Sequence, residues 1–399
     1  MSKPKKNLEK ARQIKALGNS GLKKIFIMST TPERRCIFLN TKHLTVLLKP
    51  ASGLCQLACR YCFYKDLGAA GAVTQNVMQP GTVDALIKLV ADNLAKDGHV
   101  TFAFQGGEPL LAGVEFYKNF FSRVQEAGLD ATYLFQTNGI CLCTSESGDT
   151  FIQLFKEHPC IIGLSVDGDR ILHDANRVDA KGNGTFDLVM QAYKKMTNVG
   201  IEVNFLTVLS KKVLSHPKQL YNFYKKSGIK YVQLIPCLPP LNETNQESTR
   251  ARRDLLAPFW IQFYDLWRQD FQNGRPPFEV REFYAIFRAL QGNPTDTCIF
   301  PGKCSPQLIV EADGSLYPCD FYVLPQYRTG SVFTDTLEDT LHAEGMLRFA
   351  KEIPPLPIQC QRCAYKGLCN GGCRRMRHIW HPDWDDCPMK LFLNHICNY

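Results

Sequence analysis

Three cysteines lie close together near the first predicted strand, at Cys55, Cys59 and Cys62, separated by three and then two residues. One short loop with this spacing can hold three thiolates around a soft metal. A structural zinc ion takes four protein ligands, so three cysteines leave one position open. An iron–sulfur cluster bound by three cysteines likewise keeps one iron free for an outside ligand. Phe63 and Tyr64 follow directly and are expected to shield one side. The spacing therefore predicts a thiolate-bound metal site with an open position, against the alternative of three ordinary thiols.

A second group of eight cysteines lies in the C-terminal quarter of the chain, at Cys298, Cys304, Cys319, Cys360, Cys363, Cys369, Cys373 and Cys387. Gln307–Glu311 and Ser315–Tyr317 flank an Ala-Asp-Gly turn, which predicts a hairpin that presents Cys319. Four of these cysteines could build a zinc ribbon. Eight sulfur ligands also suit two further iron–sulfur clusters, since soft thiolates bind either metal. The three-cysteine loop upstream favours iron–sulfur.

Length and composition bound the class of protein. The chain has 399 residues, 45% hydrophobic and 21% charged, which suits a globular protein with one large domain and a smaller one. The first residues contain no apolar run typical of a signal peptide, and no apolar stretch of about 18 residues predicts a membrane span. Seventeen cysteines in a reducing, cytoplasmic compartment indicate metal or redox chemistry instead of disulfides. The net charge of +9 is spread along the chain, so we expect neither a nucleic-acid nor a membrane partner.

Strand and helix patterns alternate along the first part of the chain. Six segments carry strand signals: His43–Lys49, Val100–Phe104, Thr132–Phe135, Ile161–Val166, Val203–Leu209 and Tyr231–Ile235. Helical spacing lies between them, at Val114–Gln125, Phe151–Glu157 and Phe186–Thr197. Strands joined by helical crossovers predict an α/β fold of parallel βαβ units, here a partial (β/α)6 TIM-type barrel. The predicted divisions are a basic N-terminal extension (1–40), a core barrel (41–240), a helical linker region (241–297) and a cysteine-rich domain (298–399).

Polar motifs follow three of these strands, at the ends where parallel barrels place their ligand sites. They are Gln105-Gly106-Gly107-Glu108-Pro109, Gln136-Thr137-Asn138-Gly139 and Ser165-Val166-Asp167-Gly168. The two glycines permit a tight turn and close backbone approach, and Glu108 offers a carboxylate. Each motif could also be turn chemistry alone. A structural hydrogen-bond network suits His173, Asp174 and Arg177 better than catalysis does. Helical spacing predicts a core-facing stripe at Trp260, Phe263, Trp267 and Phe271.

Together these motifs resemble one enzyme family. The spacing from Cys55 to Tyr64 resembles the cluster loop of radical S-adenosylmethionine (SAM) enzymes, and the C-terminal cysteines resemble their SPASM domain. With Phe104–Pro109 and the run Tyr317-Pro318-Cys319-Asp320-Phe321-Tyr322, the chain is similar to the anaerobic sulfatase-maturating enzymes over roughly residues 43–395. The resemblance implies oxygen-independent oxidation of a cysteine or serine in a sulfatase polypeptide to Cα-formylglycine. It also implies SAM, three 4Fe–4S clusters and an electron donor such as flavodoxin or ferredoxin.

The resemblance also assigns roles to residues. The cluster at Cys55, Cys59 and Cys62 would bind SAM through its free iron. One auxiliary cluster would take Cys298, Cys304, Cys319 and Cys373, and the other Cys360, Cys363, Cys369 and Cys387. SAM would contact the Gly-Gly-Glu turn through its amino group, and its site would comprise Tyr64, Gly106, Gly107, Glu108, Asn138 and Ser165. Tyr64 and Gln105 would line the path of the substrate peptide. Asp320 would be the general base for the thiol or hydroxyl proton, with Asp167 as the next candidate.

Two features depart from the family's pattern. Leu134 replaces a small hydroxyl residue that the family often has near the SAM carboxylate, so carboxylate binding must come from elsewhere. The basic N-terminal extension is longer than is usual in the family. Two other function classes stay open. One is a radical SAM/SPASM enzyme that forms a thioether, a carbon–carbon crosslink or an epimer in a ribosomal precursor peptide. The other is a non-enzymatic zinc-binding interaction protein.

Overall fold

The structure is a computed structural model that describes residues 41–69, 71, 73–238, 253–293, 295, 297–298, 302, 304–377 and 387–398. The predicted N-terminal extension, residues 1–40, lies outside the described residues, as does the first part of the predicted linker region.

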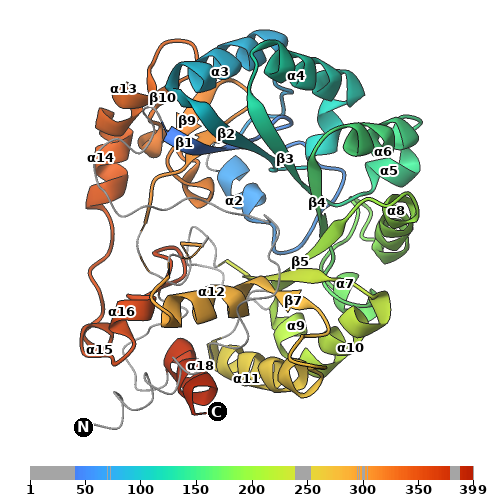
Figure 1. Ribbon diagram of the computed structural model, residues 1–399, viewed down its shortest axis with the longest axis vertical. Helices are drawn as coiled ribbons and strands as arrows, with labels where there is room; N and C mark the ends of the chain where they lie inside the picture. Colours follow the sequence, from blue (N-terminus) through green and yellow to red (C-terminus); the bar gives the residue numbers. More distant parts are fainter. Residues whose placement is uncertain are drawn as a thin grey trace.

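Six parallel strands, each hydrogen-bonded to the next in chain order, form the core of the fold. They are β1 (Thr41–Leu48), β2 (Leu94–Phe104), β3 (Asp130–Thr137), β4 (Cys160–Ser165), β5 (Val203–Leu209) and β6 (Tyr231–Pro236). Helices cover the outer face of the curved sheet (Figure 1): α3 (Pro80–Asn93), α4 (Val114–Glu126), α6 (Gly148–Glu157), α8 (Phe186–Asn198) and α10 (Pro217–Ser227). Short helices α5 (Cys141–Thr144), α7 (Arg170–His173) and α9 (Lys211–Leu214) lie in the connections. The predicted partial barrel is confirmed.

Residue alternation along β2 shows why this sequence forms a barrel strand. Successive side chains of a strand point to opposite faces. Phe102 and Phe104 are fully buried and meet Phe120 of α4 at ring-centroid distances of 5.0 and 5.1 Å. The alternate residues Thr101 and Ala103 face the cavity inside the barrel. Large rings therefore hold the helical layer against the sheet, while small side chains leave the interior open.

The predicted linker region contributes to the same sheet. Its described part contains α11 (Arg253–Gln269), β7 (Glu279–Val280) and α12 (Arg281–Leu290). β7 pairs with β6 in parallel. In α11, Trp260, Phe263 and Trp267 are buried, and the Trp267 indole N–H donates to the Phe278 carbonyl at 2.7 Å. Trp260 also stacks on Phe392 of the C-terminal helix α18 (Pro388–Cys397). These three residues are therefore core, as predicted. Phe271, the fourth residue of the predicted stripe, lies beyond the end of α11 and is only partly buried, with its ring 4.6 Å from that of Trp267.

The cysteine-rich region contains the predicted hairpin, formed by β8 (Leu308–Val310) and β9 (Ser315–Tyr317). β8 also pairs in parallel with β1, and β10 (Gly330–Ser331) pairs with β9, so the hairpin extends the barrel sheet. Next come 3₁₀ turns η3 (Asp320–Tyr322) and η4 (Pro325–Tyr327) and helices α13 (Leu337–His342), α14 (Glu344–Lys351), α15 (Ile358–Gln361) and α16 (Lys366–Cys369). Local patterns cannot reveal the β1–β8 pairing, which joins segments far apart in sequence.

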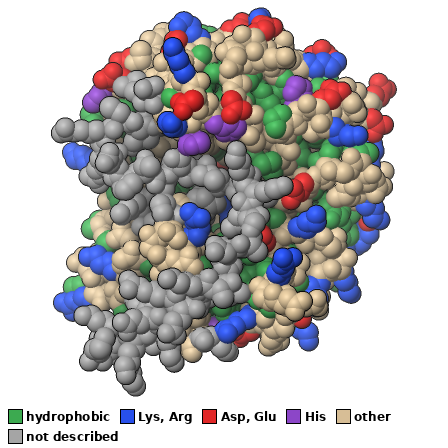
Figure 2. All heavy atoms as spheres, in the orientation of Figure 1, with side chains coloured by type: hydrophobic (Ala, Val, Ile, Leu, Met, Phe, Trp, Pro, Cys, Tyr) green, Lys and Arg blue, Asp and Glu red, His purple; other side chains and the backbone are tan. Residues whose placement is uncertain are grey.

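Among the described residues, no helix is both long enough and apolar enough to cross a bilayer. On the face shown in Figure 2, the basic side chains are interspersed with acidic ones.

Candidate active site and cysteine clusters

One cavity of about 890 Å³ occupies the barrel interior and reaches the cysteine-rich region. Its wall contains the loop cysteines Cys55, Cys59 and Cys62 and, from the C-terminal region, Cys298, Cys304, Cys319 and Cys373. Most of the other predicted site residues lie on the same wall, namely Tyr64, Gln105, Gly106, Gly107, Glu108, Asn138, Ser165 and Asp320. Residues from both ends of the chain thus meet around one volume.

The three-cysteine loop connects β1 to α2 (Phe63–Ala69), which lies inside the curve of the sheet in Figure 1. Backbone bonds tie the loop to the segment that follows α7. The N–H groups of Ala58 and Arg60 donate to the carbonyls of Val178 and Asn176, at 2.7 and 3.0 Å. The loop is therefore anchored on both sides of Cys59 by the segment that follows α7.

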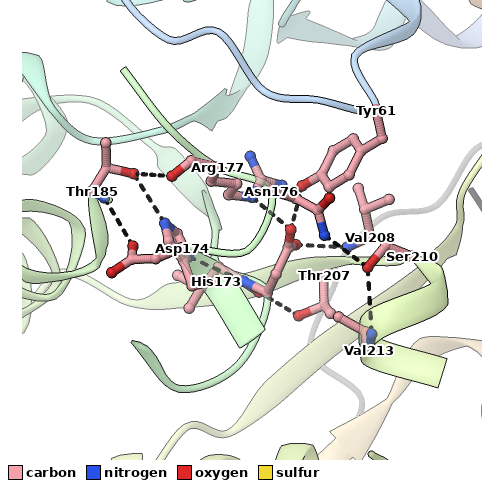
Figure 3. Close-up of polar contacts among 12 residues, drawn as sticks. Tyr61, His173, Asp174, Asn176, Arg177, Thr185, Thr207, Val208, Ser210 and Val213 are labelled. Atoms are coloured by element: carbon pink, nitrogen blue, oxygen red, sulfur yellow. Dashed lines mark hydrogen bonds and ion pairs between the residues drawn. The ribbon is translucent and has the colours of Figure 1, made fainter. Parts of the chain in front are cut away.

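A buried carboxylate, Asp167, reinforces this anchor. The Tyr61 hydroxyl donates to it, Arg177 Nε lies 3.1 Å from it, and the Val208 N–H donates to it at 2.9 Å. Tyr61 and Arg177 are drawn together with Val208 in Figure 3. Asp167 is fully buried and its oxygens are occupied by these partners. This burial and these partners disfavour Asp167 as an alternative base, a role that stays a prediction from the sequence.

His173 and its neighbours complete the network, as predicted (Figure 3). The Asp167 N–H donates to His173 Nδ1 at 3.3 Å, and His173 Nε2 lies 3.2 Å from the Thr185 hydroxyl. Burial and the nearby Arg177 charge hold the His173 pKa well below its usual range, so the ring is neutral. Asp174 accepts the Thr185 N–H at 2.8 Å. These residues position the loop and are not placed to act on a substrate.

The loop cysteines influence one another electrostatically. Enclosure by the surrounding protein, the Glu108 charge and the charges of Cys59 and Cys62 raise the pKa of Cys55 to about 12. Burial also raises the pKa of Cys59, and the charge of Cys62 adds to this effect. The Asn138 amide lies 3.8 Å from Cys55 Sγ. Thiols in such a setting stay protonated unless a positive metal centre compensates their charge.

The eight C-terminal cysteines separate into two sets in space. Burial raises the pKa of Cys373 to about 12, with contributions from Cys298 and Cys304, and the pKa of Cys319 rises for the same reasons beside Cys298 and Cys373. Burial likewise raises the pKa of Cys369 to about 12, with contributions from Cys387, Cys360 and Cys363. These electrostatic contributions agree with the two ligand sets that the sequence resemblance implies, which stay a prediction. Among the described residues, no three His, Cys, Asp or Glu side chains are grouped to hold a single metal ion.

The Gly-Gly-Glu turn packs directly under the cysteine loop. Gly107 has φ +51°, and a Cβ there would lie 2.7 Å from the Ser52 carbonyl oxygen and collide with the Leu54 carbonyl. Glycine therefore allows the next N–H, of Glu108, to donate to the Leu54 carbonyl at 2.7 Å. The turn and the loop are joined without any side chain between them.

Glu108 itself is 1% exposed, and its carboxylate is already occupied. It accepts the Thr137 hydroxyl at 2.6 Å, the Asn138 N–H at 2.7 Å and the Leu110 N–H at 3.1 Å. Burial raises its pKa to about 7. The side chain thus braces the ends of β2 and β3. A ligand in the cavity would meet mainly the backbone of this turn and the polar groups of Asn138 and Ser165 nearby.

Leu134 lies on the cavity wall with no hydrogen-bonding group, as the sequence indicates. Gln105 follows the last residue of β2; its N–H donates to the Leu48 carbonyl at 2.9 Å, and the residue lines the cavity. The Asn138 side-chain oxygen accepts from the Ile140 N–H at 2.9 Å and the Gln56 amide at 3.2 Å. This leaves the Asn138 amide nitrogen directed at Cys55.

Asp320 lies at the start of η3, beside the cysteine ligand candidate Cys319, with its side chain 16% exposed. Its carboxylate forms an ion pair with Lys49, whose side chain is fully buried at the end of β1. Lys49 was not predicted as a site residue. Strand alternation could have found it, because Lys49 continues the cavity-facing positions Thr45 and Leu47. A lysine at such a position must have a charged partner.

The donor sets fit the groups that the sequence implies. Each set gathers thiols whose raised pKa values call for a compensating metal charge, which iron provides. The loop supplies three sulfurs and so leaves one coordination position open. The three loop cysteines line a cavity of about 890 Å³ whose wall is mainly apolar with a few polar groups, enough for an amino-acid-bearing nucleoside.

Comparisons with known proteins agree with this geometry. Residues 50–224 match the Radical SAM superfamily profile, and residues 302–364 match SPASM, an iron-sulfur cluster-binding domain. The cysteine-type anaerobic sulfatase-maturating enzyme of Clostridium novyi is 33% identical over 86% of this chain and 91% of its own. The serine-type enzyme of Klebsiella aerogenes is 28% identical over 82% of this chain and 79% of its own. The solved structure of native anSMEcpe with bound AdoMet and Cp18Cys peptide superposes with a TM-score of 0.77 and 30% identity, covering 89% of this chain and 99% of that one.

Proposed function

Given that the chain belongs to the radical SAM enzymes of the anaerobic sulfatase-maturating type, we propose that it oxidises a cysteine or serine of a sulfatase polypeptide to Cα-formylglycine without oxygen. One observation carries the proposal. The Asp320 carboxylate stands on the wall of the cavity that also contains the loop cysteines and four C-terminal cysteines, and it lies next to Cys319. The names of relatives of both cysteine and serine type support the substrate class.

The proposed cofactors are SAM and three 4Fe–4S clusters, held by the three sets of cysteines described above. When bound, they supply a 5′-deoxyadenosyl radical that takes the substrate Cβ hydrogen atom, and they accept the surplus electron. The protein then has to remove one proton from the thiol or hydroxyl, which leaves a C=S or C=O double bond. For a cysteine target, water replaces sulfur in the thioaldehyde and releases hydrogen sulfide.

Asp320 is the proposed general base for that proton. A base must come within about 2.6–3.2 Å of the heteroatom that it deprotonates. Asp320 lines the cavity and is partly exposed to it, whereas Asp167 and Glu108 are buried under protein donors. Asp320 also lies next to Cys319, so its backbone is fixed beside the first auxiliary set. Among these three carboxylates, the partial exposure of Asp320 to the cavity supports its assignment to this step.

Tyr64 and Gln105 are the proposed walls of the peptide path, and Gly106, Gly107, Glu108, Asn138 and Ser165 form the proposed SAM site with Tyr64. Phe63, next to Tyr64, packs edge-on against Phe321 at 5.4 Å, so the cysteine loop and the C-terminal hairpin enclose this part of the cavity together. We further propose a cytoplasmic enzyme that receives electrons from a flavodoxin or ferredoxin. The solved relative bound to a Cp18Cys peptide supports a peptide substrate.

The test is incubation of anaerobically reconstituted enzyme with SAM, a reductant and matched sulfatase-motif peptides that carry Cys, Ser or Ala at the target position. Mass spectrometry should find an aldehyde in the Cys or Ser peptide and none in the Ala peptide. A thioether, crosslink or epimer with no aldehyde would instead identify the enzyme as a precursor-peptide modifier. Iron analysis should find roughly twelve irons per chain, and about eight after Cys55, Cys59 and Cys62 are replaced by Ala.

A further inference from the structure

Lys49 is an ammonium group with no access to water. It follows β1, its side chain is fully buried, and it lines the central cavity beside Asp320. Burying an unpaired ammonium is very costly, so the charge must be matched where it lies. The Asp320 carboxylate provides the direct match. Asp320 belongs to the cysteine-rich region and Lys49 to the barrel, so this ion pair spans the two parts of the chain.

A second carboxylate lies close to the same charge. Glu311, at the end of β8, is 4% exposed and accepts the Ser52 hydroxyl at 2.7 Å. Burial raises its pKa to about 7, and the Lys49 charge opposes that rise. The other Glu311 oxygen is buried and has no hydrogen-bond partner within the described part of the chain. Lys49 therefore lies near two carboxylates of the cysteine-rich region, of which only Asp320 lines the cavity.

The barrel holds Lys49 from its other sides. Its backbone N–H donates to the Val310 carbonyl at 2.9 Å, which continues the β1–β8 pairing. Its Nζ lies 5.1 Å from the centre of the Tyr64 ring, a cation–π contact. Gly106 has φ +88°, and a Cβ there would lie 2.5 Å from Lys49 Cδ and 2.6 Å from the Tyr64 hydroxyl. The first motif glycine thus leaves the space that the lysine and the tyrosine fill.

We propose that Lys49 is the positioning residue for Asp320: it fixes the carboxylate on the cavity wall, where proton removal takes place. The proposal rests on the proposed function of Asp320. The cysteine loop, the Gly-Gly-Glu turn and the C-terminal hairpin all meet at this lysine. A carboxylate released from it could move within the cavity, and a misplacement of about 1 Å can cost on the order of a hundredfold in rate. Radical formation, which does not use Asp320, would continue.

The test uses Lys49→Met, which keeps the length of the side chain without its charge, Lys49→Gln, which keeps a hydrogen-bond donor, and Lys49→Arg, which keeps the cation. The readout is the amount of formylglycine formed per 5′-deoxyadenosine, with iron content and SAM affinity measured in parallel. We expect the two neutral variants to keep their clusters and SAM affinity while this ratio falls at least about tenfold. The matched control is Lys195→Met, a partly buried lysine that bonds the Leu142 carbonyl outside the cavity, and its ratio should not change.

Lys49→Arg should recover part of the ratio but not all of it. The guanidinium keeps the charge, yet its planar fork is wider than an ammonium and cannot hold the carboxylate in the same place. If neither neutral variant retains its clusters, Lys49→Arg becomes the variant that tests the proposal. A ratio below that of the wild type, at normal 5′-deoxyadenosine formation, would support the proposal, and a wild-type ratio would overturn it.

A double-mutant cycle completes the test. If Lys49 acts through Asp320, Lys49→Met should reduce the ratio no further in an Asp320→Asn background. A wild-type ratio in either neutral variant would overturn the proposal, as would a fall in the ratio that is equally large without Asp320. Failure of the proposed function is distinguishable from these outcomes, because the wild-type enzyme itself would then make no formylglycine from any peptide.

Discussion

Replacing Arg177 by Met should loosen the cysteine loop at a distance from the chemistry. The Asp167 side chain is 0% exposed and the Arg177 side chain 9% exposed, and the two form an ion pair at 3.1 Å. Among its described partners, Arg177 is the only cation that contacts the Asp167 carboxylate. Without Arg177, the carboxylate keeps two hydrogen bonds but no cation. Breaking a buried pair in this way costs about 3–5 kcal/mol. Asp167→Asn in the same background removes the unpaired carboxylate charge. The double variant should therefore lose less free energy of unfolding than the two single variants together.

Hydrogen exchange of the Ala58 and Arg60 amides reports this loss directly, because both bond to the segment that carries Arg177. If the opening of the loop is coupled to the network, their exchange should speed up roughly a hundred- to a thousand-fold in Arg177→Met. Amides of α4, on the far side of the barrel sheet, serve as the internal control. Exchange at Ala58 and Arg60 within about twofold of the wild type would refute the view that Asp167 and Arg177 anchor the loop.

Three further predictions concern two residues of the cavity wall, Gly106 and Gln105, and the buried Glu311 near Lys49. Gly106→Ala should lower the free energy of unfolding by roughly 1–3 kcal/mol and weaken SAM binding, because the new Cβ would meet Lys49 and Tyr64 at a residue with φ +88°. Calorimetry measures the SAM affinity, and an unchanged affinity would contradict this prediction. The pKa of Glu311 is raised to about 7 from an ordinary 4.5, so the folded state binds its proton more tightly and stability should fall as pH rises from about 4.5 to about 7. Between pH 5 and pH 8, the free energy of unfolding should fall by about 3 kcal/mol less in Glu311→Gln than in the wild type. The same fall in both proteins would be inconsistent with a buried titrating carboxylate at this position. Gln105→Ala should weaken peptide oxidation while SAM affinity stays near the wild-type value, whereas an equal loss of both would show that Gln105 is structural.

Much of the barrel could be predicted because its signals are local. Each strand carries its own run of apolar and β-branched residues, and Val203–Leu209 was predicted with the bounds that the structure shows. The spacing of Cys55, Cys59 and Cys62 likewise predicted one compact loop. The division of the C-terminal cysteines into two sets was implied by the family resemblance alone, because Cys373 is close in sequence to Cys369 yet is assigned to the other set. The hairpin before Cys319 followed from its Ala-Asp-Gly turn.

The remaining features depend on contacts between distant segments. The pairing of β8 with β1 decides where Asp320 lies, and no local pattern encodes it. The roles of Lys49 and Glu311 follow from that pairing, because each has its partner more than 250 residues away. The resemblance assigns the Gly-Gly-Glu turn to SAM, but only the fold shows that three protein donors contact the Glu108 carboxylate. Which of these side chains are buried, and which partners they contact, can be read only from the folded structure.

The role of Asp320 as the base is tested by comparing Asp320→Asn with the wild-type enzyme on a cysteine-containing sulfatase peptide. Asn keeps the size of the side chain but cannot accept the substrate proton. With all clusters present, the variant should still convert SAM to 5′-deoxyadenosine but form little or no formylglycine. Formation of formylglycine at the wild-type rate would contradict the assignment of Asp320 as the base, on which the proposed chemistry of the cavity depends.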